Sequence, residues 1–309
     1  MTADTGRLPS TLAANAGRTI QLRQWLPDKQ PRAVILILHG LAEHSARYER
    51  FAKSATARDV AVVTYDHRGH GPAEAAGTPA HFADHDGWEH VVADVGHAVR
   101  AVRQTFPDTP LVLLGHSMGS YIAQSFAMRA PETIDLLILS GSTLPSRAEV
   151  RVARALAWLI SAASRRGSPA RLMNTLSFGK FNDAFKPNRT EFDWLSRDPA
   201  EVDKYIADAH CGQLASNRLW YDLLGGLLGI STDGAISRLT DELPVLICGG
   251  EKDPVGGKSG MTRLHEAYIA AGMSKVSVKL YPDGRHEMLN ETNRDEVTSD
   301  LLSWIETHL

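Results

Sequence analysis

A serine stands between two glycines in the pentapeptide GHSMG, residues 115–119, a pattern typical of a serine nucleophile at a sharp turn. The apolar run LVLL precedes it and the helical pattern SYIAQSFAMRA follows it. A turn from a strand into a helix presents the serine hydroxyl at the end of a sheet, and side chains at Gly115 or Gly119 would collide across it. We therefore predict a nucleophile at Ser117, held in a strained backbone conformation, with His116 and Met118 completing the turn. The alternative is a glycine-rich turn that merely contains serine, which the flanking strand and helix disfavour.

A serine hydroxyl needs a neighbouring base to take its proton, and that base needs an acid to orient it. In this strand–turn–helix context, the acid and then the base follow the serine along the chain. Of the 13 histidines, His286 follows the last apolar run, VSVKLY, in the polar turn PDGRHE. Asp253 lies in the glycine-rich loop that follows the run PVLIC. We predict His286 as the base and Asp253 as the acid, with Glu251 and Asp283 as rival acids.

The segment HGLAEH, residues 39–44, follows another apolar run, AVILIL. A loop at this place can direct a backbone N–H at the oxyanion that forms when a serine attacks a carbonyl. In this type of site the second donor is the N–H of the residue after the nucleophile, here Met118.

These loops must be carried by a sheet. Short apolar, β-branched runs alternate with helical patterns, which is typical of a mostly parallel sheet flanked by helices. Unbroken apolar runs suit strands that are covered on both faces. The expected strands are Ala33–Leu38, Val60–Tyr65, Leu111–Gly115, Leu136–Ser140, Pro244–Cys248 and Val276–Tyr281, with Arg18–Pro27 as an antiparallel edge strand.

Helical patterns fill the stretches between these runs. Apolar residues recur at helical spacing from Trp88 to Val102, and Asp86 with Glu89 predicts a capping box before them. Two further amphipathic helices are expected at residues 258–271 and 293–308.

The alternation stops after the strand that ends at Ser140 and resumes at Pro244. Between them we expect a helical, aromatic-rich insertion of residues 144–239, and a core formed by residues 1–143 and 240–309. An insertion at this point would lie over the carboxyl ends of the strands, where open α/β sheets bind their ligands.

Together, the segments HGLAEHSARY, YDHRGHG, GHSMG, GGEKDPV and GRHEMLNE resemble the monoglyceride lipase and lysophospholipase group of serine hydrolases, which overlaps serine aminopeptidase-like sequences. The resemblance covers the chain from about residue 18 to 309. It implies an α/β-hydrolase fold, with a mostly parallel central sheet flanked by helices and a helical lid inserted between sheet strands.

Carried over by position, the resemblance implies a catalytic triad of Ser117, Asp253 and His286. It also implies an oxyanion hole formed by the backbone N–H groups of Leu41 and Met118. One departure concerns the oxyanion loop, because Ala42 stands where the group usually has glycine. The loop is expected to change shape if that position requires a positive φ.

We expect hydrolysis of carboxylic esters of hydrophobic acyl groups, such as monoacylglycerols or lysophospholipids, with no metal or organic cofactor. A thioesterase would use the same triad. A serine aminopeptidase would need carboxylates in the insertion to bind the substrate ammonium, and the candidates are Glu191, Asp193, Glu201 and Asp203. A non-catalytic binding protein is disfavoured because all three triad positions are filled.

Composition narrows the other possibilities. The net charge is −3 and the basic residues are scattered, so no nucleic-acid partner is expected. The start, MTADTGRLPS, does not resemble a secretory signal, and two cysteines are too few for a disulfide framework. The pairs His67 with His70 and His39 with His44 lack cysteine or carboxylate partners at ligand spacing, so no metal site is predicted.

The segment Arg147–Arg166 mixes arginines with apolar residues. It predicts a lid helix that packs over the mouth of the site, and such a helix can also touch a lipid surface transiently. The sequence therefore favours a cytoplasmic protein, with peripheral membrane contact as an option, and it does not indicate an oligomeric state.

Overall fold

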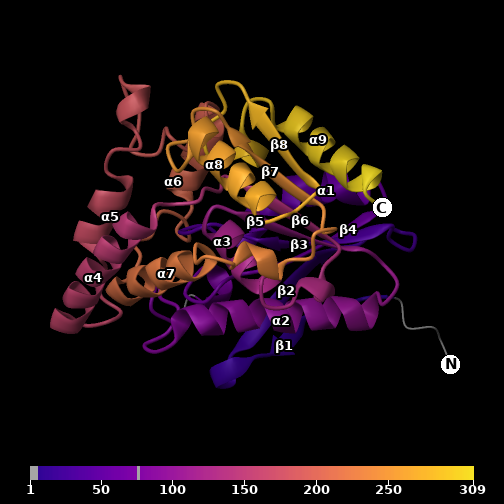
Figure 1. The fold of residues 1–309 in the computed structure, drawn as a ribbon, viewed down its shortest axis with the longest axis horizontal. Helices are drawn as coiled ribbons and strands as arrows, with labels where there is room; N and C mark the ends of the chain where they lie inside the picture. The colour runs from indigo at the N-terminus through magenta and orange to yellow at the C-terminus, as the bar shows by residue number, and fades with distance from the viewer. Residues whose placement is uncertain (1–5, 75–76) are drawn as a thin grey trace.

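The central feature of the fold is an eight-stranded sheet with the order β1-β2-β4-β3-β5-β6-β7-β8 (Figure 1). The computed structural model describes residues 6–74 and 77–309; residues 1–5, part of the start judged not to be a secretory signal, lie outside the described residues. The strands are β1 Thr11–Ala13, β2 Thr19–Trp25, β3 Ala33–Leu38, β4 Val60–Tyr65, β5 Leu111–His116, β6 Leu136–Ser140, β7 Val245–Gly250 and β8 Val276–Tyr281.

From β4 to β8 every pairing is parallel, so the carboxyl ends of these strands share one edge of the sheet. The predicted antiparallel strand is present as β2, which pairs with β4. Its predicted place at the edge of the sheet is wrong, however, because the short strand β1 pairs with its other side. With only three residues, β1 is too short to show an alternating pattern in the sequence.

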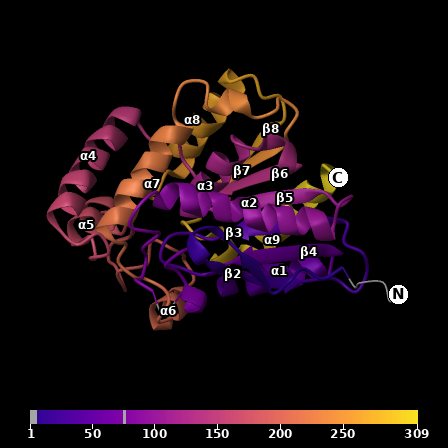
Figure 2. The ribbon, with the colours of Figure 1, turned by 90° about the horizontal axis from the view of Figure 1, so that it is seen from below.

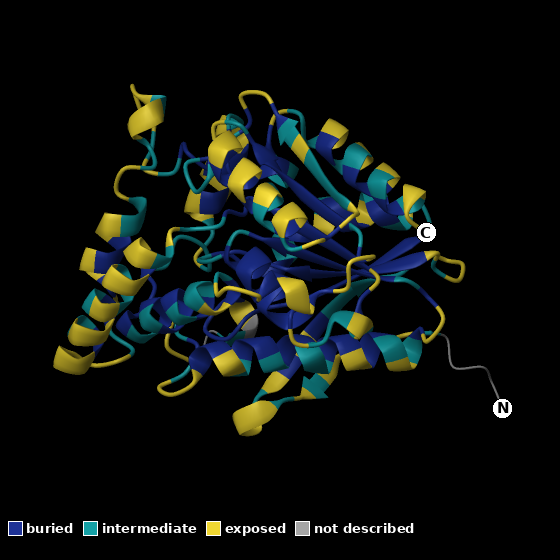
Figure 3. Ribbon diagram, in the orientation of Figure 1, coloured by how far each residue is buried: buried dark blue, intermediate teal, exposed yellow. Residues whose placement is uncertain are grey.

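Alternate residues of the central strands point into two separate cores, one on each face of the sheet. In β3, Leu36 packs in one apolar cluster, and Ile35 packs in the other. The first cluster includes residues of α2 Gly87–Thr105, α3 Met118–Ala127 and α8 Gly257–Ala270, and the second includes residues of α1 Glu49–Thr56 and α9 Arg294–Thr307. Figure 2 shows these layers, and Figure 3 shows the buried strands between half-exposed helices. Covering on both faces explains why the strands read as unbroken apolar runs.

Four helices lie between β6 and β7, at one end of the sheet (left in Figures 1 and 2). They are α4 Arg147–Ala163, α5 Arg171–Phe178, α6 Pro199–Ala207 and α7 Asn217–Ile230. Helix α7 packs against α4 on one side and against α2 and α3 on the other. Its buried Trp220 and Leu223 therefore belong to the same apolar cluster as the sheet.

Short 3-10 helices occur in the connections, at Asn15–Gly17, Ser45–Tyr48, Pro72–Glu74, Pro131–Thr133, Asp183–Phe185, Ile236–Arg238 and Met288–Asn290.

The capping box predicted for α2 is wrong. Asp86 adopts a left-handed conformation, with φ 50°, and its side chain makes no cap hydrogen bond. Glu89 instead accepts a hydrogen bond of 2.9 Å from the Arg129 guanidinium of the neighbouring helix connection. A left-handed N-cap directs the aspartate away from the first turn, so the motif lacks the geometry that it needs.

Candidate active site

Ser117 lies in the turn between β5 and α3, with φ 51° and ψ −120°. This confirms the strained backbone expected of a serine in such a turn. A Cβ at Gly115 would approach the Gly119 carbonyl oxygen to 2.4 Å, and one at Gly119 would approach that of Leu38 to 2.1 Å. The turn can therefore close only with glycine at both places.

His286 and Asp253 form a buried pair at the same edge of the sheet. Asp253 follows β7 and His286 follows β8, and Nδ1 of the histidine is 2.9 Å from Oδ2 of the aspartate. The exposed fractions of the two side chains are 4% and 1%. Burial lowers the pKa of His286, but the charge and hydrogen bond of Asp253 raise it, and the pKa lies above its ordinary value. The carboxylate thus orients the ring with Nε2 free and stabilises its protonated form.

Neither rival acid makes this contact. Glu251 lies 3.5 Å from the ammonium of Lys258, in the first turn of α8. Asp283 is exposed, has a φ of 58° at its turn, and shares no hydrogen bond with His286 among the described residues.

The loop after β3 carries the predicted oxyanion donor Leu41 to the cavity that Ser117 and Met118 also line. Within the described chain, neither the Leu41 nor the Met118 N–H donates a hydrogen bond to another residue. Ala42 has φ 57°, so this position does adopt the left-handed conformation that glycine usually provides. Alanine therefore occupies a left-handed position in this loop, at the cost of some strain at Ala42.

A buried charge network underlies this loop, and the sequence analysis missed it. Glu43 accepts hydrogen bonds from the Gly40 N–H at 2.5 Å and the Tyr48 hydroxyl at 2.9 Å. Arg47 bonds Glu43 at 2.7 Å and Glu287 through two bonds of 2.6 Å. Burial raises the pKa of Glu43, but the charges of Arg47, His116 and His39 together lower it more, to about 2. In the sequence, Glu43 precedes His44 and Glu287 follows His286, and this proximity to the motif histidines was the only sign that the two glutamates belong to the site.

The insertion also holds the loop that carries His286. The N–H groups of His286 and Glu287 donate to the carbonyl oxygens of Trp194 and Leu195, at 3.3 and 2.8 Å. The Trp194 ring lies 5.1 Å from the imidazole of His286, centroid to centroid. The base is thus positioned by the core and by the insertion together.

Ser117 and His286 line one cavity of about 960 Å³ between the strand ends and the insertion. This volume is near the upper end of the range for small-molecule sites, roughly 300–1,000 Å³. Its apolar wall comes mainly from the insertion and includes Phe178, Phe181, Phe192, Trp194, Trp220, Leu223 and Leu227. The aromatic residues around Phe178 and Phe192, for which the sequence left open a pocket or an internal packing role, do line the cavity.

Four buried histidines lie beneath the site, and we call them the histidine cluster: His39, His67, His70 and His116. Burial lowers the pKa of all four, to about 3 for His70 and about 4 for His116. His39 Nε2 accepts the His67 backbone N–H at 2.9 Å, and its Nδ1 bonds the Gly40 carbonyl oxygen at 2.7 Å. The lowered pKa values keep the four histidines neutral at pH 7, and His39 joins the loop after β3 to the loop after β4.

The carboxylates of the insertion are mostly engaged elsewhere. Asp193 accepts the backbone N–H groups of residues 189 and 190, Glu201 bonds Arg50 at 2.9 Å, and Asp203 lies 2.7 Å from Arg189. Only Glu191, among the four candidates for binding an ammonium, lines the cavity.

The family model described as serine aminopeptidase, S33, matches residues 29–293 of the chain. The chain belongs to this family. It is similar to the monoacylglycerol lipase of Mycolicibacterium smegmatis, with 31% identity over 308 residues and 98% of each chain covered. The monoglyceride lipase of Homo sapiens is 29% identical over 304 residues, which cover 95% of this chain and 87% of that relative.

Among solved structures, a thermostable carboxyl esterase from Bacillus coagulans in complex with glycerol matches with a TM-score of 0.86 and 25% identity. The match covers 96% of this chain and 97% of the esterase. This S33 family member is thus an α/β hydrolase of the esterase and lipase type, and both the expected fold and the expected family are confirmed. Among its described helices, none is long and apolar enough to cross a bilayer.

Proposed function

We propose that the chain hydrolyses carboxylic esters of hydrophobic acyl groups, of the monoacylglycerol or lysophospholipid kind, through an acyl-enzyme. The observation that carries this proposal is the meeting of a strained serine and a buried His–Asp pair at one large apolar cavity. The similarity to monoacylglycerol lipases supports the choice of substrate class.

In this mechanism Ser117 Oγ attacks the ester carbonyl while His286 Nε2 takes the serine proton. The N–H groups of Leu41 and Met118 donate to the developing oxyanion, and each such donor typically contributes about 2.7–4 kcal/mol to lowering the barrier. His286 then gives its proton to the leaving alcohol oxygen as the C–O bond breaks. Water, deprotonated by the same histidine, attacks the acyl-enzyme and releases the acid and free Ser117.

In this proposal, residues 144–239 act as a lid on a core of residues 1–143 and 240–309, since the insertion forms most of the apolar wall. The outer surface of the lid carries exposed apolar side chains, among them Val152, Trp158 and Leu159 of α4, and Leu172 and Leu176 of α5. Figure 3 shows α4 and α5 as largely exposed helices at the end of the molecule. We therefore propose that this surface touches lipid aggregates transiently. Replacing Trp158 and Leu159 by serine should reduce co-flotation with phospholipid vesicles and leave hydrolysis of a soluble ester unchanged; equal flotation would refute the contact.

The experiment that tests the reaction is hydrolysis of a series of p-nitrophenyl esters, from short to long acyl chains, followed by monoacylglycerols. Ser117→Ala should abolish turnover, whereas Ser274→Ala, at an exposed turn between α8 and β8, should not. Loss of activity in both variants, or in neither, would contradict the assignment of Ser117.

Two other activities of the same site are separable by assay. A thioesterase would use the same triad, so only the substrate separates it from an esterase, and assays with acyl thioesters make that distinction. Aminoacyl-arylamides distinguish an aminopeptidase, for which the cavity offers Glu191 as an ammonium ligand. Cleavage of arylamides with no cleavage of acyl esters would replace the proposed function by a peptidase function.

A further inference from the structure

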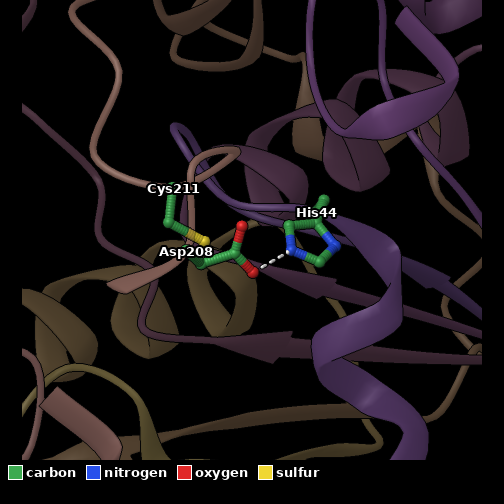
Figure 4. A group of neighbouring side chains, drawn as sticks. All are labelled: His44, Asp208 and Cys211. Atoms are coloured by element: carbon green, nitrogen blue, oxygen red, sulfur yellow. Dashed lines mark hydrogen bonds and ion pairs between the residues drawn. The ribbon is translucent and has the colours of Figure 1, made fainter. Parts of the chain in front are cut away.

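His44, Asp208 and Cys211 form a cluster that no step of the proposed reaction uses (Figure 4). His44 lies in the loop after β3, close to Leu41, while Asp208 and Cys211 lie between α6 and α7. His44 Nε2 is 2.8 Å from Asp208 Oδ2, and one ligand atom of each residue lies within 4.8 Å of the other two. Figure 4 shows the cysteine sulfur and the carboxylate facing the imidazole from a separate segment of the chain.

We propose that this cluster is a binding site for a divalent zinc ion. Imidazole nitrogen, carboxylate oxygen and thiolate sulfur are the three ligand types that Zn²⁺ prefers in proteins, whereas Mg²⁺ and Ca²⁺ select oxygen alone. Binding would release the thiol proton of Cys211 to solvent, with Asp208 ionised and His44 neutral as ligands.

The distances fit such an ion after a small adjustment. Zinc–ligand bonds of about 2.0–2.3 Å in a tetrahedral arrangement separate the ligand atoms by roughly 3.3–3.8 Å. His44 Nε2 and Asp208 Oδ2 must therefore move apart by about 0.5–1 Å from their hydrogen-bonded separation. The other separations lie within 4.8 Å and would have to contract by at most about 1–1.5 Å.

The surroundings complete the site. Asp208 Oδ1 accepts the His210 backbone N–H at 2.8 Å, which fixes the carboxylate and leaves Oδ2 for the ion. The His210 imidazole lies edge-on to that of His44, with centroids 6.1 Å apart, and offers a fourth ligand on rotation.

The local charge also favours a cation. Among the described residues, the Asp208 carboxylate has no arginine or lysine partner and pairs with His44, whereas the nearby Glu43 and Glu287 are both bonded to Arg47. The uncompensated carboxylate charge of Asp208 attracts a cation.

The ion would join the insertion to the oxyanion loop. These segments already meet, since the Gly212 N–H and the Tyr205 hydroxyl both donate to the Ala42 carbonyl oxygen at 2.9 Å. A zinc ion at the cluster would add metal–ligand bonds to this contact. Its ligand His44 directly follows Glu43 in the sequence and lies three residues after Leu41.

The test is titration of the metal-stripped full chain with Zn²⁺ against a competing chelator, and separately with Co²⁺ as a spectroscopic substitute. The wild type should bind one Zn²⁺ per chain and raise its Tm on binding. Cys211→Ala and Asp208→Asn should each weaken Zn²⁺ binding by at least about tenfold. Removing a residue that merely hydrogen-bonds to a metal ligand typically weakens binding by about 10–100-fold, and removing a ligand itself should cost no less. The thiolate-to-Co²⁺ charge-transfer band should be present in the wild type and absent in Cys211→Ala.

Cys248→Ala is the matched control, because the only other cysteine of the chain is buried in β7, outside the cluster. It should bind Zn²⁺ as the wild type does. Failure of the wild type to bind, or equal affinity in Cys211→Ala, would overturn the proposal and leave His44 and Asp208 as a simple hydrogen-bonded pair. If Asp208→Asn does not fold, Cys211→Ser gives the same decision. None of these readouts depends on hydrolytic activity, so the result stands apart from the proposed function.

Discussion

Replacing Asp253 by asparagine isolates the role of the buried His286–Asp253 pair. Because their side chains are only 4% and 1% exposed, water cannot take the place of the lost charge. When His286 becomes protonated during the reaction, it would be a buried cation without its partner. Removing one member of a buried ion pair typically costs about 3–5 kcal/mol, a factor of about 10²–10⁴ in rate.

A second effect acts in the same direction. The amide of asparagine can donate to Nδ1, which places the histidine proton on Nε2, where it cannot accept the Ser117 proton. A wrong tautomer of this kind lowers kcat by about 10⁴ in serine proteases. We therefore expect kcat/KM for a p-nitrophenyl ester to fall by about 10³–10⁴ in Asp253→Asn.

The pH profile provides an independent readout. The reaction needs neutral His286, and Asp253 holds its pKa above the ordinary value of 6.5, so activity should fall on the acid side with a midpoint above pH 6.5. Without the carboxylate, burial remains as the largest effect and lowers the pKa, so the midpoint should move to lower pH. Asp283→Asn is the control, because asparagine tolerates the positive φ at this exposed turn.

The reasoning is refuted if Asp253→Asn keeps more than about a tenth of wild-type kcat/KM, equivalent to a cost below about 1.4 kcal/mol. It is also refuted if the acid midpoint moves to higher pH, or if Asp283→Asn produces the loss instead.

Three further predictions concern the scaffold. Gly119→Ala should abolish esterase activity and lower Tm, because its Cβ would lie 2.1 Å from the Leu38 carbonyl oxygen. Gly229→Ala, which has open space around its Cβ, should instead raise the free energy of unfolding by about 0.4–1 kcal/mol. Equal effects of the two substitutions would contradict the steric argument. Glu43→Gln should lower the free energy of unfolding by about 1–3 kcal/mol by weakening a buried charged network, whereas the exposed Glu49→Gln should leave it nearly unchanged, both measured by urea unfolding. In the histidine cluster, burial lowers each pKa in the folded state, so below pH 6.5 the unfolded chain binds more protons than the folded chain. The free energy of unfolding should therefore decrease as the pH is lowered below 6.5, by up to about 1.4 kcal/mol per pH unit for each histidine. A urea midpoint that stays constant from pH 6.5 to 5 would exclude this.

Local patterns were sufficient wherever the chemistry of a segment depends on its neighbours in sequence. Four of the six expected parallel strands have the observed bounds. For β3, β4 and β6 the reason is that a strand covered on both faces must be apolar nearly throughout, whereas β8 is a half-buried edge strand. The turn at Ser117 was predictable for a similar reason, since the glycines at 115 and 119 are required by contacts within the turn and with the adjoining strand.

Local patterns failed where a competing conformation or a distant partner decides the outcome. The capping box at Asp86 has suitable residue types, but the backbone is left-handed there. The contact of His44 with Asp208 and Cys211 gave no local signal either, because Asp208 lies 164 positions further along the chain, and folding brings its Oδ2 to 2.8 Å from His44 Nε2.

The sequence by itself determined the alternation of central strands and helices along the chain, the turn that presents Ser117, and the loops that carry Asp253 and His286. These features follow from short-range sterics and from the apolar periodicity of each segment. Only the tertiary structure decided that Asp253, rather than Glu251 or Asp283, pairs with His286, and that the insertion forms the wall of the cavity. Such choices depend on which side chains are buried together across the sheet edge, and burial sets the strength of a charge or hydrogen bond only once the chain has folded.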